Sequence, residues 1–157
     1  MAASSTPAAS KPASPSAVAS GLHAPVSACA VVTKADVVQA MGFAIGNGEE
    51  QAEDATSTCS YAKHQGMVSV MVQRLQKKMN IEAEVAALRT SIPDSAVREA
   101  TGLGKRAFFL DIPGAGTQLY VIKGDSDFLM VSVLGFGEAA RVSPAAEALA
   151  RKALGRL

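Results

Sequence analysis

Two cysteines, Cys29 and Cys59, are the only ones in this chain of 157 residues. Cysteines that occur as an even pair are usually bridged in exported proteins, whereas isolated cysteines of cytosolic proteins are usually free. We therefore expect a disulfide that ties the first helix to the first strand. In the chain-entropy model, closing a loop of this length stabilises a fold by about 3.5 kcal/mol. Free buried thiols and a catalytic or metal-binding pair are the alternatives.

A short helix over residues 34–41 is predicted between the two cysteines. Thr33 is suited to cap the first turn, and Asp36 three residues later completes a capping box. Gly42 is placed to end the helix. Because a helix of two turns is not stable alone in water, we expect it to pack against the rest of the domain.

Residues 1–28 differ in composition from the rest of the chain, because Ala, Ser and Pro dominate them. Such a segment buries too little apolar surface to fold, so we expect a disordered tether before a single domain over residues 29–157. The segment lacks the basic start and apolar core of a secretion signal. Tethers of this kind commonly follow the cleavage site of exported bacterial proteins. We therefore expect a periplasmic or secreted protein whose signal lies upstream of Met1.

Composition and charge exclude several classes of function. The net charge is +1, from 15 basic and 14 acidic residues, which gives no basic footprint for nucleic acid. Aromatic residues make up 4% of the chain and Trp is absent, so few rings can stack on bases or sugars. No apolar run approaches the roughly 18 residues that a membrane-spanning helix needs. The expected partner is a small ligand or an envelope protein, with no nucleic acid and no transmembrane segment.

Alternating apolar residues joined by short glycine-containing connections predict strands arranged as antiparallel hairpins. In residues 67–75 the three valines point one way and a mixed set points the other, as in a sheet covered fully on one side only. Residues 127–134 are apolar on both faces, which places that strand centrally in the sheet. The predicted strands are residues 57–63, 67–75, a possible short 97–100, 106–112, 117–123 and 127–134.

Two further helices are predicted. Asn80 caps the first, over residues 81–91, and Pro93 ends it. Ser143 and Pro144 are the N-cap and the first residue of the last helix. The order is helix, two strands, helix, a possible short strand, three strands, helix. It predicts an α+β fold in which helices pack on an antiparallel sheet of about five strands.

The polar motifs of the chain match no catalytic or metal-binding pattern. Residues 49–54 hold four carboxylates, but the spacing of a calcium loop is absent, so a solvated loop is expected there. His23 and His64 are too few to build a zinc site with the two cysteines, because His23 lies in the tether. The glycines of residues 102–104 precede a strand rather than the helix that a phosphate loop requires. We therefore predict no catalytic residue, no cofactor and no metal.

A set of short motifs over residues 29–157 resembles a family of exported bacterial proteins. Many of these are lipoproteins, and they are similar in outline to the extracellular sensor domains of some mycobacterial Ser/Thr kinases. The resemblance implies an antiparallel sheet covered by helices, a disulfide and a cell-envelope location, and it implies no catalytic residue. No lipobox is visible, so the resemblance is compatible with both lipid-anchored and unanchored precursors. The motifs are Cys29-x-x-x-Thr33 with a helix ending at Gly42, Cys59-x-Tyr61, Gly102-Leu-Gly104 before an aromatic strand, and a Lys-Gly-Asp hairpin.

The leading functional hypothesis is a non-enzymatic envelope or secreted module that binds a ligand or a protein. An apolar cleft with a few polar groups is the usual binding site, so a sheet face or a cleft beside it is the expected surface. A rival hypothesis is a protein inhibitor of an extracellular hydrolase, which presents Gln65-Gly66 and residues 113–116 as a rigid pair of loops. A third is an enzyme that uses the acidic residues 49–54. The candidate ligand-binding residues, which are plain core residues in the alternative interpretation, are Tyr61, Met71, Phe108, Tyr120 and Phe136.

Overall fold

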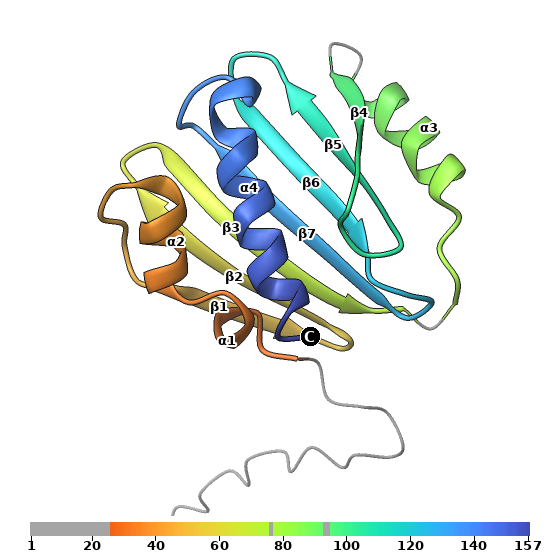
Figure 1. Cartoon of the computed structure of the whole chain (residues 1–157), viewed down its shortest axis with the longest axis horizontal. Coiled ribbons are helices and arrows are strands. Elements are labelled where there is room, and N and C mark those ends of the chain that lie inside the picture. Colours follow the sequence, from red (N-terminus) through yellow and green to blue (C-terminus); the bar gives the residue numbers. More distant parts are fainter. Residues whose placement is uncertain (1–25, 76, 93–94) are drawn as a thin grey trace, which may run out of the picture.

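An antiparallel sheet with helices packed on both faces forms the domain, and Figure 1 shows the face that the last helix crosses. The computed structural model describes residues 26–75, 77–92 and 95–157. Within these residues there are seven strands and four helices, so the α+β class is confirmed, with more strands than expected. The predicted tether falls mostly on residues 1–25, which lie outside the described residues, as does Pro93. Ala28, the last residue of the predicted tether, is fully buried in the domain.

The order of the elements differs from the predicted order by two additions near the start of the chain. Helix α1 and strand β1 are new, and the possible short strand is present as β4. The elements are α1 (Ala28–Val31), α2 (Lys34–Met41), β1 (Glu49–Glu53), β2 (Thr56–Lys63), β3 (Gly66–Arg74), α3 (Ile81–Ser91), β4 (Ala96–Ala100), β5 (Arg106–Ile112), β6 (Gly116–Ile122), β7 (Asp127–Leu134) and α4 (Ala139–Leu154).

Strand β7 lies at the centre of the sheet, whose strand order is β1-β2-β3-β7-β6-β5-β4. It pairs with β3 on one side and with β6 on the other, and Val131 lies opposite both Val70 and Leu119. All neighbouring strands are antiparallel. The predicted central position of this strand is therefore confirmed.

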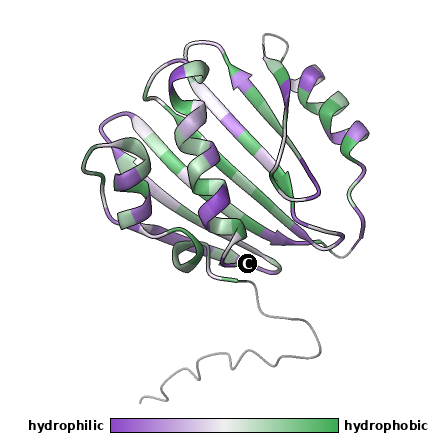
Figure 2. Cartoon of the chain, viewed as in Figure 1, coloured by the Kyte–Doolittle hydropathy of each residue, from purple (hydrophilic) through white to green (hydrophobic). Residues whose placement is uncertain are grey.

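The two faces of the sheet differ in how they are covered. Helices α1, α2 and α4 lie on one face, which we call the helix face, and the larger hydrophobic core is buried there (Figure 1). Helix α3 packs through Ile81, Val85 and Leu88 on part of the opposite face, which we call the open face. Hydrophobic and hydrophilic residues alternate along several strands (Figure 2), because successive side chains point to opposite faces.

Strand β1 shows that the prediction of a solvated loop over residues 49–54 was wrong. Its residues pair with β2 in antiparallel register, and all five are exposed. Acidic residues have low β propensity, but pairing of the backbone along an existing strand outweighs that preference. The turn after β1 contains Asp54, whose φ of 51° is a left-handed conformation that Asp tolerates. The carboxylates therefore form a charged sheet edge, a feature that discourages edge-to-edge pairing.

Helix α4 begins earlier than predicted. Its N-cap is Glu138, which makes no side-chain capping bond, and its first residue is Ala139. Pro144 therefore lies inside the helix, and the hydroxyl of Ser143 donates to the carbonyl oxygen of Ala139 at 2.6 Å instead of capping a new helix. Proline removes one backbone hydrogen bond from a helix interior. The buried apolar face of α4, which packs in the main core, offsets this loss.

The predicted N-caps of α2 and α3 are confirmed. Thr33 Oγ accepts from the backbone N–H of Asp36 at 3.3 Å, and the Asp36 carboxylate accepts from the backbone N–H of Thr33 at 2.8 Å. Gly42 follows α2 with a left-handed φ of 79°. The side-chain oxygen of Asn80 accepts from the backbone N–H of Ala83 at 3.2 Å. Both helix starts are thus fixed by neighbours in the sequence.

The predicted disulfide between Cys29 and Cys59 is present, with the two Cα atoms 5.0 Å apart, but it joins α1 to β2 and not the predicted helix over residues 34–41, which is α2. Cys59 is fully buried in the core of the helix face. Polar contacts support the bridge, because the backbone N–H of Ala28 donates to Ser57 Oγ at 3.0 Å and that hydroxyl donates to Glu50 at 2.9 Å. The four-residue helix α1 is therefore held to the sheet by a covalent bond and by hydrogen bonds.

Asp36 joins α2 to the end of the chain. Its side chain is buried and forms ion pairs with Arg156 and, at 3.6 Å, with Lys152. Arg156 also donates to the backbone carbonyl oxygen of Val31 at 2.9 Å. The hydrogen bond from Arg156 holds the pKa of Asp36 well below its usual range. One buried carboxylate thus connects α1, α2 and the segment after α4.

Replacing Asp36 by Asn should lower the free energy of unfolding by about 2 kcal/mol at neutral pH, because hydrogen bonds to a buried charged group are weakened. A carboxyl with a depressed folded-state pKa stabilises the fold above its unfolded pKa of about 4, and this contribution is lost as the pH falls through the folded-state pKa. The difference in stability between the wild type and D36N should therefore shrink in acid. Urea unfolding at about pH 7 and about pH 3 measures both effects.

The matched control for this variant is Asp125→Asn. Asp125 pairs with Lys105 at 2.9 Å, but both side chains are mostly exposed, and exposed ion pairs contribute little to stability. D125N should therefore unfold like the wild type. A D36N protein that is as stable as the wild type at neutral pH would contradict the role of Asp36.

Reduction of the Cys29–Cys59 disulfide should lower the free energy of unfolding by about 3.5 kcal/mol, because the bridge restricts the unfolded chain. Urea unfolding with and without a reductant measures the change. The double variant C29A/C59A should be destabilised without reductant and should not respond to it. If the oxidised and reduced proteins unfolded at the same urea concentration, the polar contacts of α1 would be sufficient and the bridge would not be needed.

Candidate binding surface on the open face

A row of polar side chains crosses four adjacent strands on the open face. Ser60 of β2 lies opposite Ser69 of β3. Ser69 in turn lies opposite Ser132 of β7, which lies opposite Gln118 of β6. We call these four residues the polar row. Because neighbouring strands are about 4.8 Å apart, the row presents hydrogen-bonding groups at regular intervals.

The side chains of the polar row hydrogen-bond to one another. The hydroxyl oxygens of Ser60 and Ser69 are 3.2 Å apart. The side-chain amide of Gln118 donates to Ser132 Oγ at 3.5 Å, and its side-chain oxygen accepts from the Tyr120 hydroxyl at 2.9 Å. A serine hydroxyl has one proton and two lone pairs, so each can accept a further hydrogen bond. Ser60, Ser69 and Gln118 are partly exposed and can bind a partner, whereas Ser132 is buried.

An apolar wall borders the polar row on the side where α3 packs. Met71 and Met130 lie opposite each other in the next row of the sheet, and Tyr120 lies opposite Met130 on its other side. The rings of Tyr120 and Phe108 stack with centroids 4.9 Å apart in the cluster that α3 covers. Burial raises the pKa of Tyr120, so its hydroxyl stays protonated and can donate. The open face thus combines hydroxyl groups with flexible apolar side chains.

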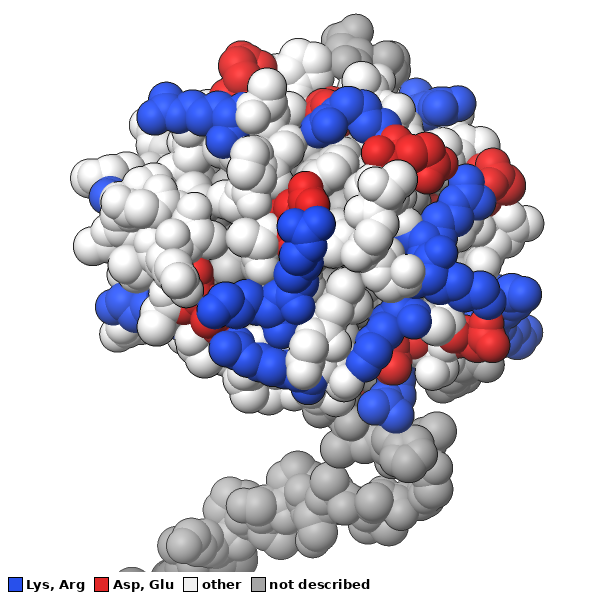
Figure 3. Space-filling view, in the orientation of Figure 1, with Lys and Arg blue, Asp and Glu red and all other residues white. Residues whose placement is uncertain are grey.

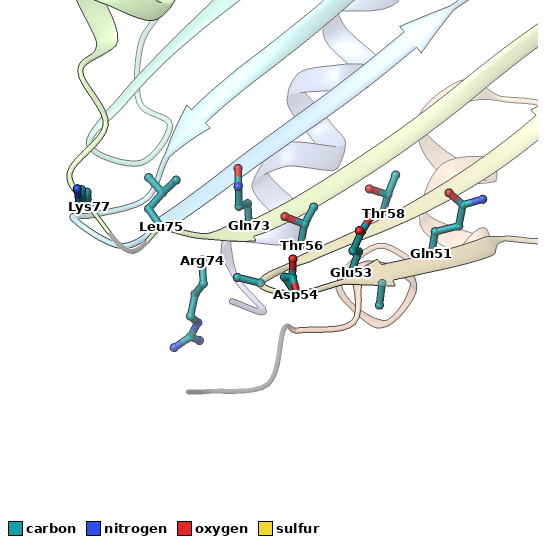
Figure 4. Close-up of a pocket in the computed structure, with 11 residues that line it drawn as sticks. Gln51, Glu53, Asp54, Thr56, Thr58, Gln73, Arg74, Leu75 and Lys77 are labelled. Carbon is teal, nitrogen blue, oxygen red and sulfur yellow. The ribbon is translucent and has the colours of Figure 1, made fainter. Parts of the chain in front are cut away.

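A shallow hollow of about 800 Å³ lies at the end of β1, β2 and β3, next to the polar row. Thr56, Thr58 and Gln73 point to its open-face side, whereas Arg74 points the other way (Figure 4). Sites for small molecules usually enclose most of the ligand and are mainly apolar, so this open polar hollow fits an extended partner better. The residues that line it are Gln51, Ala52, Glu53, Asp54, Ala55, Thr56, Thr58, Gln73, Arg74, Leu75 and Lys77.

The structure brings three of the five predicted site residues together and separates the other two. Met71, Phe108 and Tyr120 share the open face, although Phe108 is buried under α3. Tyr61 lies on the helix face, is 1% exposed, and donates its hydroxyl to a backbone carbonyl oxygen between α1 and α2. Phe136 lies beyond the end of β7, in the turn before α4. Two of the five residues therefore lie away from the open face.

The sequence alone does not reveal the polar row, although part of its signal is present. Ser69 alternates with the valines of β3, which places it on the second face of that strand. Its neighbours, however, depend on which strands pair. Ser132 lies more than sixty positions further along the chain and becomes a neighbour only because β7 pairs with β3. Strand order, which hydrophobic periodicity does not encode, assembles this surface.

The acidic residues of β1 have different roles. Glu50 accepts hydrogen bonds from the hydroxyls of Ser27 at 2.6 Å and Ser57 at 2.9 Å, and these bonds lower its pKa. It therefore stays ionised and holds α1. Glu49 and Glu53 are exposed at the sheet edge. Across residues 26–75, 77–92 and 95–157, no cluster of three or more His, Cys, Asp or Glu could hold a metal ion.

Comparison of the chain with protein-family models, with curated proteins and with solved structures finds no match. In the part of the chain that the structure describes, no helix has both the length and the apolar character needed to cross a membrane. Function is therefore inferred from the surfaces of the domain itself.

Proposed function

We propose that the chain is a non-enzymatic extracytoplasmic module that binds a protein or an extended peptide through the open face. The observation that carries this proposal is the polar row, whose four side chains are aligned across β2, β3, β7 and β6 outside the cluster covered by α3. Cross-strand rows of hydroxyl and amide groups offer both donors and acceptors to a partner. The partly exposed residues of this surface are Ser60, Ser69, Gln118, Met71, Met130 and Tyr120, and the buried Ser132 positions Gln118 by a hydrogen bond.

A protein partner fits this face better than a small molecule or a sugar. The hollow beside the polar row is wide and open, so it would leave most of a compact ligand in water. Tyr120 is half-buried and hydrogen-bonded, which leaves little ring surface for a sugar to stack on. Met71 and Met130 supply apolar contact that adapts to the shape of a partner. Apolar side chains surrounded by polar ones are the usual anatomy of a protein interface.

The disulfide between Cys29 and Cys59 supports a location outside the cytosol. A structural disulfide persists in oxidising compartments and is rare in the reducing cytosol. The Ala, Ser and Pro composition of the first residues and the resemblance to exported bacterial proteins, many of them lipoproteins, favour the same location. Periplasmic and secreted forms both satisfy these observations.

A hydrolase inhibitor is the second candidate function, because the two loops that would present it lie at the same end of the sheet. The turn between β2 and β3 and the loop between β5 and β6 both contact Gly135. Its backbone N–H donates to the carbonyl oxygen of Ala115 at 2.8 Å. A Cβ at Gly135 would lie 2.7 Å from the Cα of Gly66, so the turn packs tightly against it. The two loops are therefore held as a pair, as an inhibitor would require.

The open-face proposal is tested by removing the hydroxyls of the polar row in the variant S60A/S69A/S132A. We expect an uncharged, capped decapeptide rich in Ser, Thr and Asn to bind the wild type at millimolar concentration. Methyl NMR of labelled methionines should then show shifts at Met71 and Met130 and none at Met41, which lies on the helix face. The triple variant should bind at least about fivefold more weakly, because each lost hydrogen bond contributes about 1 kcal/mol.

The matched control is Ser91→Ala, which removes a hydroxyl from the exposed end of α3 and should leave binding unchanged. A neutral sugar tetramer serves as the comparison ligand. If the triple variant bound the peptide as well as the wild type, the polar row would not be the binding surface. If the sugar shifted the same methyl signals more strongly than the peptide, the partner would not be a protein.

The inhibitor alternative has a separate test. Incubation with serine, cysteine and metallo-type proteases and with glycosidases should show stoichiometric inhibition of at least one class. Replacing Gln65 by Ala, at an exposed turn position, should then weaken inhibition and leave the free energy of unfolding unchanged. Cleavage of the chain at either loop without inhibition would contradict this function.

A further inference from the structure

We propose that the domain has a second interaction surface, at the end of the sheet where β2 meets β3, which binds an acidic protein segment carrying an apolar anchor side chain. Five residues form it, and we call them the loop-end patch: Phe43, Lys63, His64, Phe136 and Arg141. The two hollows of the patch are lined by no residue of the polar row, and the patch does not depend on the function proposed for the open face.

A pair of aromatic rings forms the centre of the loop-end patch. Phe43 and Phe136 are half-buried, and their ring centroids are 5.2 Å apart. The ring of Phe136 covers the backbone of Gly66 so closely that a Cβ there would lie 2.5 Å from it. Phe43 belongs to neither hydrophobic core, and the ammonium of Lys63 lies 4.2 Å from its ring centroid. The fold thus holds Phe43 in place without burying it in a core.

Two hollows share these rings. One, of about 410 Å³, is lined by both phenylalanines together with Lys63, His64 and Gln65. The other, of about 180 Å³, is lined by the same two rings and by residues of α2 and α4, including Arg141. Half-buried aromatic residues beside pockets, with arginine nearby, are typical of the centre of a protein interface.

The charge of the loop-end patch is unbalanced. Neither hollow is lined by a carboxylate, and within the described residues neither Lys63 nor Arg141 forms an ion pair. On the α3 side, by contrast, Lys105 and Arg106 form ion pairs with carboxylates, and Figure 3 shows red and blue atoms intermixed there. The nearest acidic residue along the chain, Glu138, accepts a hydrogen bond from Gly114 at 3.4 Å. Two uncompensated cations therefore flank the rings.

These features define the partner by its chemistry. The rings and hollows accept an apolar side chain, and the cations attract carboxylates on either side of it. A nucleic acid is a poor match, because Lys63 and Arg141 are too few to neutralise a run of phosphates. A second copy of this chain is also a poor match, because its densest run of carboxylates, in residues 49–54, includes no aromatic or large aliphatic side chain. An acidic protein segment with one apolar anchor satisfies both requirements.

The probe for this proposal is a capped hexapeptide, Asp-Glu-Leu-Phe-Asp-Glu, titrated into the folded protein. Backbone NMR shifts should map to the loop-end patch and to Gly66 and Gly135, and they should weaken as salt is added. The double variant K63E/R141E should bind at least about tenfold more weakly, because each reversed charge turns attraction into repulsion. The matched control K77E/K78E makes the same change in net charge beyond the opposite end of β3 and should bind like the wild type.

Two altered peptides complete the experiment. Replacing the four acidic residues by Lys should abolish binding, and replacing Leu-Phe by Ser-Ser should weaken it at least about tenfold, since a buried aromatic anchor contributes well over 1 kcal/mol. Equal binding of the Lys peptide would overturn the charge argument. Shifts spread along β1 instead of the loop-end patch, or no shifts at millimolar peptide, would overturn the proposed site. Circular dichroism of each variant confirms that a loss of binding is not a loss of fold.

Discussion

The pairing of β7 with β3 is the constraint on which the rest of the structure depends. The last strand of the chain lies between β3 and β6, and so joins the group β1-β2-β3 to the group β4-β5-β6. Strand β3 therefore ends near the centre of the sheet, while β4 begins at its far edge. The chain has to pass the positions of β7, β6 and β5 to reach β4, and α3 lies on this path. After β7, α4 returns over the helix face and completes the main core.

This path of the chain explains why α3 covers only part of the open face. Helix α3 covers the residues of β4 to β7 near its own axis, and the polar residues of β2 and β3 lie outside its reach. Ser132 interrupts the apolar residues 128–134 of β7 and is only 5% exposed. A buried hydroxyl needs a hydrogen-bond partner, and Gln118 on the neighbouring strand supplies one. The hydrogen bond between Ser132 and Gln118 thus satisfies the buried hydroxyl of the central strand, while the partly exposed Ser60, Ser69 and Gln118 are left for a partner.

Local signals account for the parts of the fold that the sequence predicts correctly. The capping box at Thr33, the cap at Asn80 and the apolar runs of β5 and β7 act over a few residues, so the bounds of α2, α3, β5 and β7 match the prediction. Helix α1, strand β1 and the early start of α4 depend on distant contacts. At α4 a strong local signal, Ser143 before Pro144, was overridden, and the earlier start of the helix places Val142 in the core.

The candidate site was less predictable than the fold, for two reasons. The burial of Tyr61 could have been predicted from the sequence. It lies two residues after Cys59 on the same strand, so both side chains point to the same buried face. The loop-end patch and the polar row could not be predicted from the sequence, because each combines residues that are far apart along the chain. Phe43 and Phe136 meet only after α2 and α4 have packed on the helix face.

Helices α1 and α2 are too short to be stable by themselves, so contacts with the rest of the domain have to hold them on the helix face. Three contacts of different kinds hold them: the disulfide to β2, the hydrogen bonds of Glu50, and the ion pair between the buried Asp36 and the partly exposed Arg156. Together they fix the start of the domain to its first strands and to its last residues. With this side of the sheet closed by α1, α2 and α4, the surfaces left for a partner are the open face and the ends of the sheet. The polar row and the loop-end patch lie on these surfaces.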